Sequence, residues 1–387
     1  MLHAAQENHF CQRQRSIDPV HLLDTLLEVL SSHKSIDVTV LHRHYVSKHR
    51  YVSYSSFYEQ LSKPECVLWL KHLLNLALGI LQANIWERLS TLWQYFDDVR
   101  IHDGSSWAVR DNLKDILPGR FKTIAPAAIE LHATFSLLKG QLCQAQLAPD
   151  TVSEHHFFPT AYPNFLYLFD AGFVNLPALK RFEKAGAYFL ARGKKGLNPF
   201  VIHDWNNGPV NQSLKSLSLK SRQNYDFQVS QKGVEYRLIL LWNPQTKTHV
   251  AFLTNVPVEW LSKKALGKVY RLRWQIELLF KELKSFSGLK RLLTGNKQIV
   301  EGLVYVSLLA CTLRRFLVLS AQKDKPLSTL KAGRSSASFL PEFLRCWRKK
   351  GAEAFNSLNT YLRRVMTISA PHKRHAFTPF GNGKVLS

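Results

Sequence analysis

Two aspartates occupy positions where a carboxylate could do chemistry. Asp103 ends the run Val-Arg-Ile-His-Asp, Asp170 ends the apolar run Phe-Leu-Tyr-Leu-Phe-Asp, and each is followed closely by glycine. An acid at the carboxyl end of a buried strand lies on the rim of an α/β sheet, where such proteins bind ligands. Glycine lets the backbone turn away and leaves the carboxylate open to a cation. The pair therefore predicts a metal site, although either aspartate alone could instead cap the turn or helix that follows it.

A third acid, Glu277, lies in a segment that predicts an amphipathic helix from residue 270 to 286. At about 100° per residue, its polar stripe contains Tyr270, Arg273, Glu277, Lys281 and Lys284, and its apolar face contains Leu272, Ile276, Leu279, Leu283 and Phe286. The stripe could be an exposed ladder of ion pairs, each worth ~0.2–0.5 kcal/mol. Tyr270 and Trp274 beside the acid favour a site in which Glu277 holds metal while cations and rings hold a nucleic-acid strand.

The charge of the chain also indicates a polyanionic partner. The 387 residues carry a formal charge of +24, and residues 261–387 hold 25 Lys and Arg against 6 Asp and Glu, or +19. A cluster such as Arg345, Arg348, Lys349 and Lys350 suits phosphates, although a solvated basic face is the alternative. Hydrophobic residues make up 45% of the chain, which excludes a disordered protein.

The elements that must position these residues form an α/β pattern. Residues 19–95 predict helices, and VSYSSFYEQL gives the outline of a helix-turn-helix, or equally of a bundle without DNA contact. Strands are then predicted at 99–103, 129–138, 142–147, 165–169 and 187–191, with a helix at 176–184. Further strands at 200–203, 225–229, 235–242 and 249–253 indicate a β-rich insertion, and helices follow at 263–286 and 300–319.

These residues resemble the DDE transposases of bacterial insertion sequences. The spacing of Tyr270, Arg273, Glu277 and Lys284 matches the Tyr-Arg-Glu-Lys signature of one cut-and-paste branch, and Asp103 and Asp170 match its two aspartates. The β-rich insertion before the glutamate is another trait of that branch. The resemblance covers roughly residues 95–320. The chain departs from the family's Asp-Arg-Gly-Tyr after the second aspartate, where it has Asp-Ala-Gly-Phe.

The resemblance implies an α/β fold with a ribonuclease-H-like core and a mixed sheet. The implied organisation is a helical N-terminal domain with possible DNA binding (1–95), the first part of the core (96–192), the insertion (193–262), the core helices (263–320) and a helical basic C-terminal region (321–387). Asp103, Asp170 and Glu277 would hold two Mg²⁺ ions, with Mn²⁺ able to substitute, for in-line phosphoryl transfer. Tyr270, Arg273, Trp274, Lys281 and Lys284 would contact DNA.

The implied activity is metal-dependent cutting of double-stranded DNA at the element's end repeats and joining of the 3′-hydroxyl ends to target DNA, by a homodimer in the DNA complex. A nuclease or resolvase with the same metal chemistry, or a catalytically decayed DNA-binding protein, is the alternative. Five scattered cysteines without a Cys-x-x-Cys pair suggest neither disulfides nor a zinc site. No secretory signal is evident, and no apolar run of the ~18 residues that span a bilayer is expected. We therefore expect a cytoplasmic, nucleoid-associated bacterial protein without membrane contact.

Overall fold

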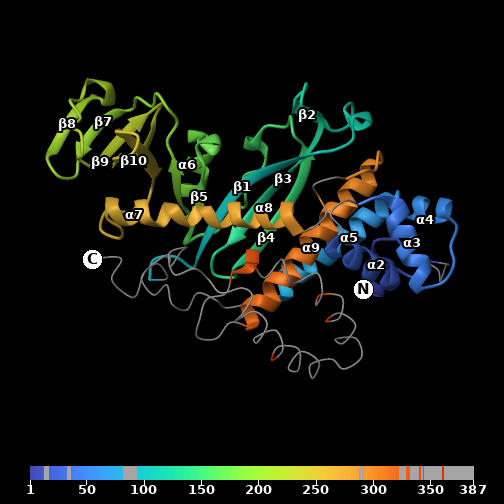
Figure 1. Cartoon of the computed structure of the whole chain (residues 1–387). Coiled ribbons are helices and arrows are strands. Elements are labelled where there is room, and N and C mark those ends of the chain that lie inside the picture. The colour runs from blue at the N-terminus through green and yellow to red at the C-terminus, as the bar shows by residue number, and fades with distance from the viewer. Residues whose placement is uncertain are drawn as a thin grey trace.

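The computed structural model describes residues 1–12, 17–32, 36–81, 94–286, 289, 292–321 and 328–331, together with Leu340, Phe343 and Thr360. Most of the predicted C-terminal region, 321–387, including its cluster at 345–350, lies outside the described residues. The described part has a mixed α/β architecture, with one large mixed sheet, helices across its faces and a helical N-terminal segment to one side (Figure 1).

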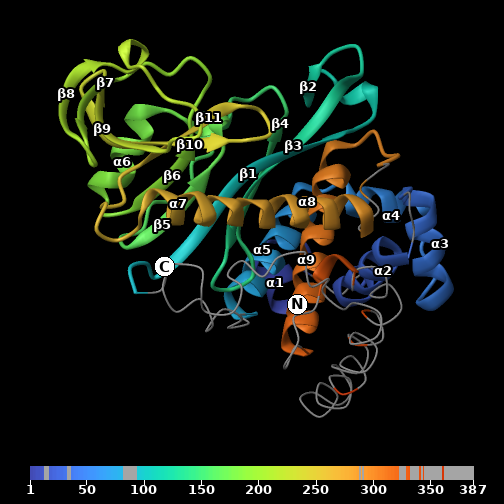
Figure 2. The ribbon, with the colours of Figure 1, turned by 60° about the vertical axis from the view of Figure 1, so that its left-hand side comes forward.

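The N-terminal helices pack mainly against the long helix α9 (Lys297–Ala321) (Figure 2). They are α1 (Leu2–Glu7), α2 (Pro19–Ser32), α3 (Val38–Lys48), α4 (Tyr54–Leu61) and α5 (Pro64–Ile80). The Asp37 carboxylate accepts a hydrogen bond from the Thr39 N–H and starts α3, while the Ser53 hydroxyl accepts one from the Ser56 N–H and starts α4. The predicted helix after the serine-rich turn is therefore present, with its expected cap.

The central strands join a hairpin-built part of the sheet to a parallel crossover unit. These strands are β1 (Asp98–Ala108), β2 (Pro118–Phe121), β3 (Ala125–Ser136), β4 (Gln141–Pro149), β5 (Phe165–Phe169) and β6 (Tyr188–Arg192). β3 runs antiparallel to β1 and β4, whereas β5 lies parallel to both β1 and β6. The helix α6 (Leu176–Lys184) makes the crossover between β5 and β6.

Two details of this sheet differ from the sequence prediction. Asp103 does not end its strand, because β1 pairs with β3 as far as Ala108 and its backbone groups find partners there. The short edge strands β2 and β8 (Gly208–Ser213) were not predicted, since both lie in turn-rich sequence without alternation of apolar residues.

The predicted β-rich segment continues the same sheet. Its strands are β7 (Phe200–Asp204), β8, β9 (Tyr225–Gln231), β10 (Val234–Asn243) and β11 (Thr248–Thr254), and β11 pairs antiparallel with β6. A buried ion pair holds this part together, because the Arg237 guanidinium donates to both carboxylate oxygens of Asp226 at 2.6 and 2.8 Å. Arg237 also donates to the carbonyls of Val256, Pro257 and Leu261, which tie the last strand to the next helix.

The predicted helix at 263–286 is present in two parts that run end to end across one face of the sheet (Figures 1 and 2). α7 (Lys263–Tyr270) is followed by the 3₁₀ turn η5 (Arg271–Arg273) and α8 (Trp274–Phe286). On α8 and η5 the predicted apolar face is buried, with Leu272, Ile276, Leu279 and Leu283 at most 1% exposed. The opposite, polar stripe thus remains available above β1.

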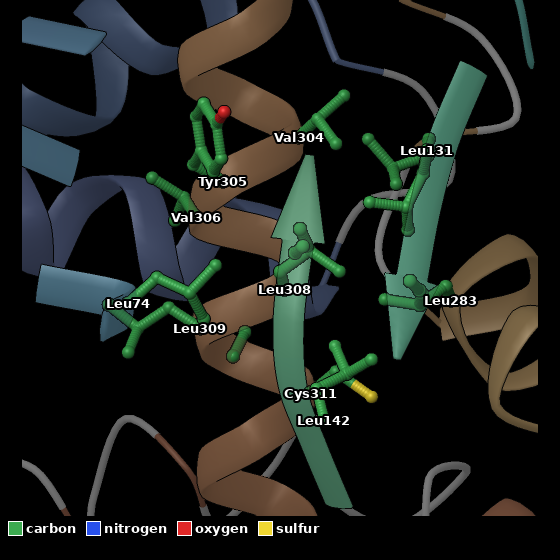
Figure 3. Close-up of a cluster of buried hydrophobic side chains, with 14 of the residues drawn as sticks. Leu74, Leu131, Leu142, Leu283, Val304, Tyr305, Val306, Leu308, Leu309 and Cys311 are labelled. Carbon is green, nitrogen blue, oxygen red and sulfur yellow. The ribbon is translucent and has the colours of Figure 1, made fainter. Parts of the chain in front are cut away.

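α9 is the central core helix, with apolar contacts on several sides. Figure 3 shows Val304, Leu308 and Cys311 of α9 among Leu131 of β3 and Leu142 of β4. Contrary to the sequence expectation, the stretch Lys297–Ser320 is long and apolar enough to span a membrane, but most of it is buried inside the protein. Its apolar character is that of a helix surrounded by protein.

Candidate active site

Asp103 and Asp170 lie at the same level of neighbouring strands. β1 and β5 are parallel, and their register pairs His102 with Phe169, so the next residue of each segment is an aspartate. Alternation along β1 places Asp103 on the face that also carries the buried Ile101, toward α8. Asp170 comes directly after β5 and precedes the 3₁₀ turn η3 (Ala171–Phe173).

Glu277 completes the group from α8. An open pocket of about 440 Å³ is lined by Asp103, Asp170 and Glu277 together with Gly104, Arg273, Phe280, Lys281, Lys284 and Ser285. The structure thus brings together the three predicted acids, which are 67 and 107 residues apart in the chain, and three of the predicted cations. The sequence had indicated Gly104 as the residue that leaves Asp103 open, but not Phe280 and Ser285, which flank the stripe at helical spacing.

Arg273 lies between two of the acids. Its Nη1 donates to Asp103 Oδ2 at 2.9 Å, its Nη2 forms an ion pair with Glu277, and only 15% of its side chain is exposed. The Tyr270 hydroxyl donates to Asp170 Oδ1 at 3.3 Å. Two residues predicted to hold a nucleic-acid strand therefore contact the carboxylates in this structure, and the predicted Arg273–Glu277 pair of the ladder is present.

The remaining predicted DNA contacts differ in exposure. Trp274 is 54% exposed and is not among the residues lining the pocket. Lys281 is exposed at the pocket, whereas Lys284 is half-buried, with its Nζ 5.4 Å from the centre of the Trp107 ring. Burial lowers the pKa of Lys284.

The local electrostatics make Asp103 an unusual carboxyl. Burial raises its pKa from 3.8 to about 6, while Arg273 and the Gly104 N–H, which donates to Oδ1 at 2.9 Å, act to lower it. Repulsion from Asp170 and Glu277 contributes to the rise of this pKa. A cation bound among the three carboxylates would relieve this repulsion.

The donor set agrees with a hard divalent cation by its chemistry, since all three acids offer carboxylate oxygens. Within the described ranges, no three His, Cys, Asp or Glu side chains are gathered closely enough to hold a metal ion. The ion pairs of Arg273 account for this spacing, because its guanidinium stands between Asp103 and Glu277. The three acids thus suit such an ion by their ligand chemistry, and the Arg273 guanidinium lies between two of them in this structure.

Known proteins identify the family to which this arrangement belongs. The family described as "Transposase DDE domain" matches residues 94–313, more than half of the chain and the whole of the pocket. The chain belongs to this family. A transposase of insertion sequence IS231F from Bacillus thuringiensis subsp. israelensis is 24% identical over 323 residues, which are 69% of this chain and 67% of that transposase. The transposase of IS1151 from Clostridium perfringens is 22% identical over 311 residues, 65% of each chain.

The chain is thus a DDE transposase of the insertion-sequence type, a family of metal-dependent enzymes that cut and join DNA. Among solved structures, the transposase is similar to a piggyBac transposase in a synaptic complex with hairpin DNA. The TM-score is 0.46 at 12% identity, over 96% of this chain and 81% of that one.

Proposed function

We propose that this transposase binds the ends of an insertion sequence, cleaves the DNA there by two-metal phosphoryl transfer and joins the 3′-hydroxyl ends to target DNA. The observation that carries the proposal is the meeting of Asp103, Asp170 and Glu277, from three separate elements, in one pocket with basic side chains at its rim. Acids and cations at one site suit a reaction in which a phosphodiester is held and its charge is neutralised.

The acids would hold the catalytic metal, and other residues would hold the acids. Asp103, Asp170 and Glu277 would bind two Mg²⁺ ions, or Mn²⁺ in their place, which when bound supply Lewis-acid activation of the attacking and leaving oxygens. In the metal-free protein Arg273 forms ion pairs with Asp103 and Glu277 and offsets their mutual repulsion, and the Tyr270 hydroxyl donates a hydrogen bond to Asp170.

The DNA strand would be held at the mouth of the pocket. Lys281 and Lys284 line it and would bind phosphate oxygens, and the exposed ring of Trp274 would stack on a base. We propose that Arg273 and Tyr270 contact the strand as well when cations replace their bonds to the acids. The helices α3 and α4 and the basic residues of 321–387 would add sequence-independent affinity for the duplex, in a homodimer acting in the bacterial cytoplasm at the nucleoid.

The order of the central strands supports a ribonuclease-H-like core. Five strands follow one another as β4-β3-β1-β5-β6. Among them β3 alone runs opposite to the rest, antiparallel to both β4 and β1, whereas β1, β5 and β6 are parallel to one another. We propose domain limits at 1–95, 96–192, 193–262, 263–320 and 321–387, with the second and fourth segments forming the catalytic core.

The experiment is a cleavage assay on a supercoiled plasmid that carries the element with its flanking DNA. The full-length transposase with Mg²⁺ should nick at the element ends and then produce joined products, and EDTA should abolish both. Asp103→Asn, Asp170→Asn and Glu277→Gln should each lose cleavage while they retain DNA binding, and Glu259→Gln, at an exposed acid away from the pocket, should behave as wild type.

Two outcomes would count against the proposal. Cleavage without any joined product would favour the alternative of a nuclease or resolvase. Cleavage by Asp103→Asn at the wild-type rate would refute the assignment of the carboxylates.

A further inference from the structure

A second group of polar residues lies behind the pocket, on the opposite face of the sheet. Because side chains alternate along a strand, Gly104 and Ser106 of β1 face away from the side that carries Asp103. β3 runs beside them and pairs Glu130 with Ser106 and His132 with Gly104. Glu130 and His132 are 3% and 1% exposed, so this face is both polar and buried.

Arg120, next to the end of β2, joins the acids of this group. Its Nη2 donates to Glu130 Oε2 at 3.2 Å and to the Asp150 carbonyl at 3.0 Å, and its backbone N–H donates to Asp150 Oδ2 at 2.9 Å. Its Nη1 lies 3.8 Å from Glu154 Oε1, in the 3₁₀ turn η2 (Glu154–His156). Its Nη2 also lies 3.9 Å from Asp150 Oδ1, so one guanidinium pairs with three carboxylates from three segments. We call this group the Arg120 cluster (Arg120, Glu130, Asp150 and Glu154).

Two of these carboxylates lie where a side chain would stand on the glycines that follow the two aspartates. A Cβ atom at Gly104 would stand 2.6 Å from Glu130 Oε1, and one at Gly172 would stand 2.5 Å from Glu154 Oε2. Neither glycine has a positive φ. The backbone conformation does not require glycine at these two positions, but a side chain there would displace a carboxylate of the cluster.

We infer that Arg120, Glu130 and Glu154 are positioning residues, which fix the two segments carrying Asp103 and Asp170 relative to each other from behind the sheet. The inference rests on the proposed metal site. Asp103 precedes Gly104 and Asp170 lies two residues before Gly172, so Glu130 and Glu154 lie beside the backbone segments that carry two of the proposed metal ligands. Residues that hold metal ligands in place commonly change metal affinity or activity 10–100-fold when they are replaced.

Charge explains why the cluster depends on Arg120. Burial raises the pKa of Glu130 to about 7, Arg120 opposes this rise, and the neighbouring Asp150 and Glu154 add to it. Without the guanidinium, three carboxylates would face one another on a mostly buried surface and would separate or take up protons. Either response would release the contacts at Gly104 and Gly172.

The test measures Mn²⁺ binding to the full-length protein by electron paramagnetic resonance, with DNA affinity and plasmid cleavage measured beside it. Arg120→Gln should weaken Mn²⁺ binding ~10–100-fold and slow cleavage, with DNA affinity unchanged. Lys122→Gln removes one positive charge from an exposed position of the same hairpin and should bind Mn²⁺ as wild type does. Equal losses in both variants, or wild-type Mn²⁺ binding by Arg120→Gln, would overturn the positioning role.

A second pair of variants covers the case in which Arg120→Gln does not fold. Glu154 is 29% exposed in its side chain, so Glu154→Ala should fold and should weaken Mn²⁺ binding in the same direction. Gly172→Ala would displace the same carboxylate. The double variant Glu154→Ala/Gly172→Ala should therefore bind Mn²⁺ no more weakly than Gly172→Ala alone. Additive losses, or wild-type Mn²⁺ affinity in Glu154→Ala, would contradict the inference.

The variant Asp103→Asn distinguishes a failure of this inference from a failure of the proposed function. Asp103→Asn should lose Mn²⁺ binding at the pocket. If it binds Mn²⁺ as wild type does, the proposed metal site is wrong and the inference falls with it. If Asp103→Asn loses the ion while Arg120→Gln and Glu154→Ala both keep it, only the positioning role is wrong.

Discussion

Replacing Asp103 by asparagine should stabilise the metal-free protein at neutral pH while abolishing its activity. The carboxyl is 21% exposed in its side chain and has a pKa of about 6 in the folded protein, against 3.8 without the fold. Burial is the main cause, and Arg273 offsets only part of it. The ionised form, which the proposed chemistry needs, is therefore the form that the fold tolerates poorly.

The magnitude follows from the difference between these two pKa values. At ~1.4 kcal/mol per pKa unit, it corresponds to roughly 3 kcal/mol of destabilisation when Asp103 is ionised. Because the folded state binds this proton more tightly than the unfolded chain, the penalty is fully present above about pH 6. It falls away between pH 6 and 4 and is absent below about 3.8. Asparagine carries no charge at any pH, so Asp103→Asn should gain up to this amount at pH 8 and almost nothing at pH 4.

The assay is urea unfolding of the full-length protein in EDTA at pH 8 and at pH 4. Asp115→Asn, at an exposed aspartate, serves as the matched control and should not change the free energy of unfolding at either pH. Mg²⁺ added at pH 8 should stabilise the wild type more than Asp103→Asn, because a ligand stabilises only the state that binds it. An Asp103→Asn variant that is no more stable than wild type at pH 8 would refute this account of the site's electrostatics.

Three other changes test separate parts of the molecule. Arg237→Met alone should lower the free energy of unfolding by ~3–5 kcal/mol, because it leaves the buried Asp226 carboxylate without its ion pair. Adding Asp226→Leu should restore much of this free energy, as measured by urea unfolding. Truncation after Gln322 should flatten the salt dependence of DNA affinity, by ~0.9 in logarithmic slope for each phosphate that the shortened protein no longer neutralises. An unchanged slope would place the DNA surface on the N-terminal helices. Arg273→Ala and Lys284→Ala should slow joining of pre-nicked ends more than the first nick, with partial rescue by Arg273→Lys. Equal slowing of both steps would mean that Arg273 acts only by holding Asp103 and Glu277 in place and does not contact DNA.

The sequence predicted those elements whose signal is local. The strand Phe165–Phe169 and the helix Leu176–Lys184 have the bounds that their apolar patterns indicate, and α8 buries the face that its spacing marks as apolar. Apolar residues recur every 2 residues in a half-buried strand and every 3.6 residues in a helix. This pattern involves only residues close together in the sequence, so it can be recognised without knowledge of the fold. For the same reason the polar stripe with Glu277 could be recognised as a candidate site.

Pairing between distant segments decided what the sequence left open. β1 extends past Asp103 because β3 offers hydrogen-bond partners up to Ala108, and β2 is a strand only because β3 lies beside it. Edge strands of this kind depend on their neighbour more than on their own residues. The amino-acid pattern also gave no sign that β11 would join the insertion to β6.

The candidate site also combines features that the sequence determines with features that only the tertiary structure determines. The residue types and their spacing along one helix determined which acids and cations were available, because those properties belong to the chain itself. Only the tertiary structure decided that Asp103 and Asp170 stand side by side, through the parallel register of β1 and β5, and that Arg273 bridges Asp103 to Glu277. It alone placed Arg120 behind the sheet among three acids. Such contacts join residues far apart in sequence, and their energies depend on burial and distance, neither of which a local pattern contains.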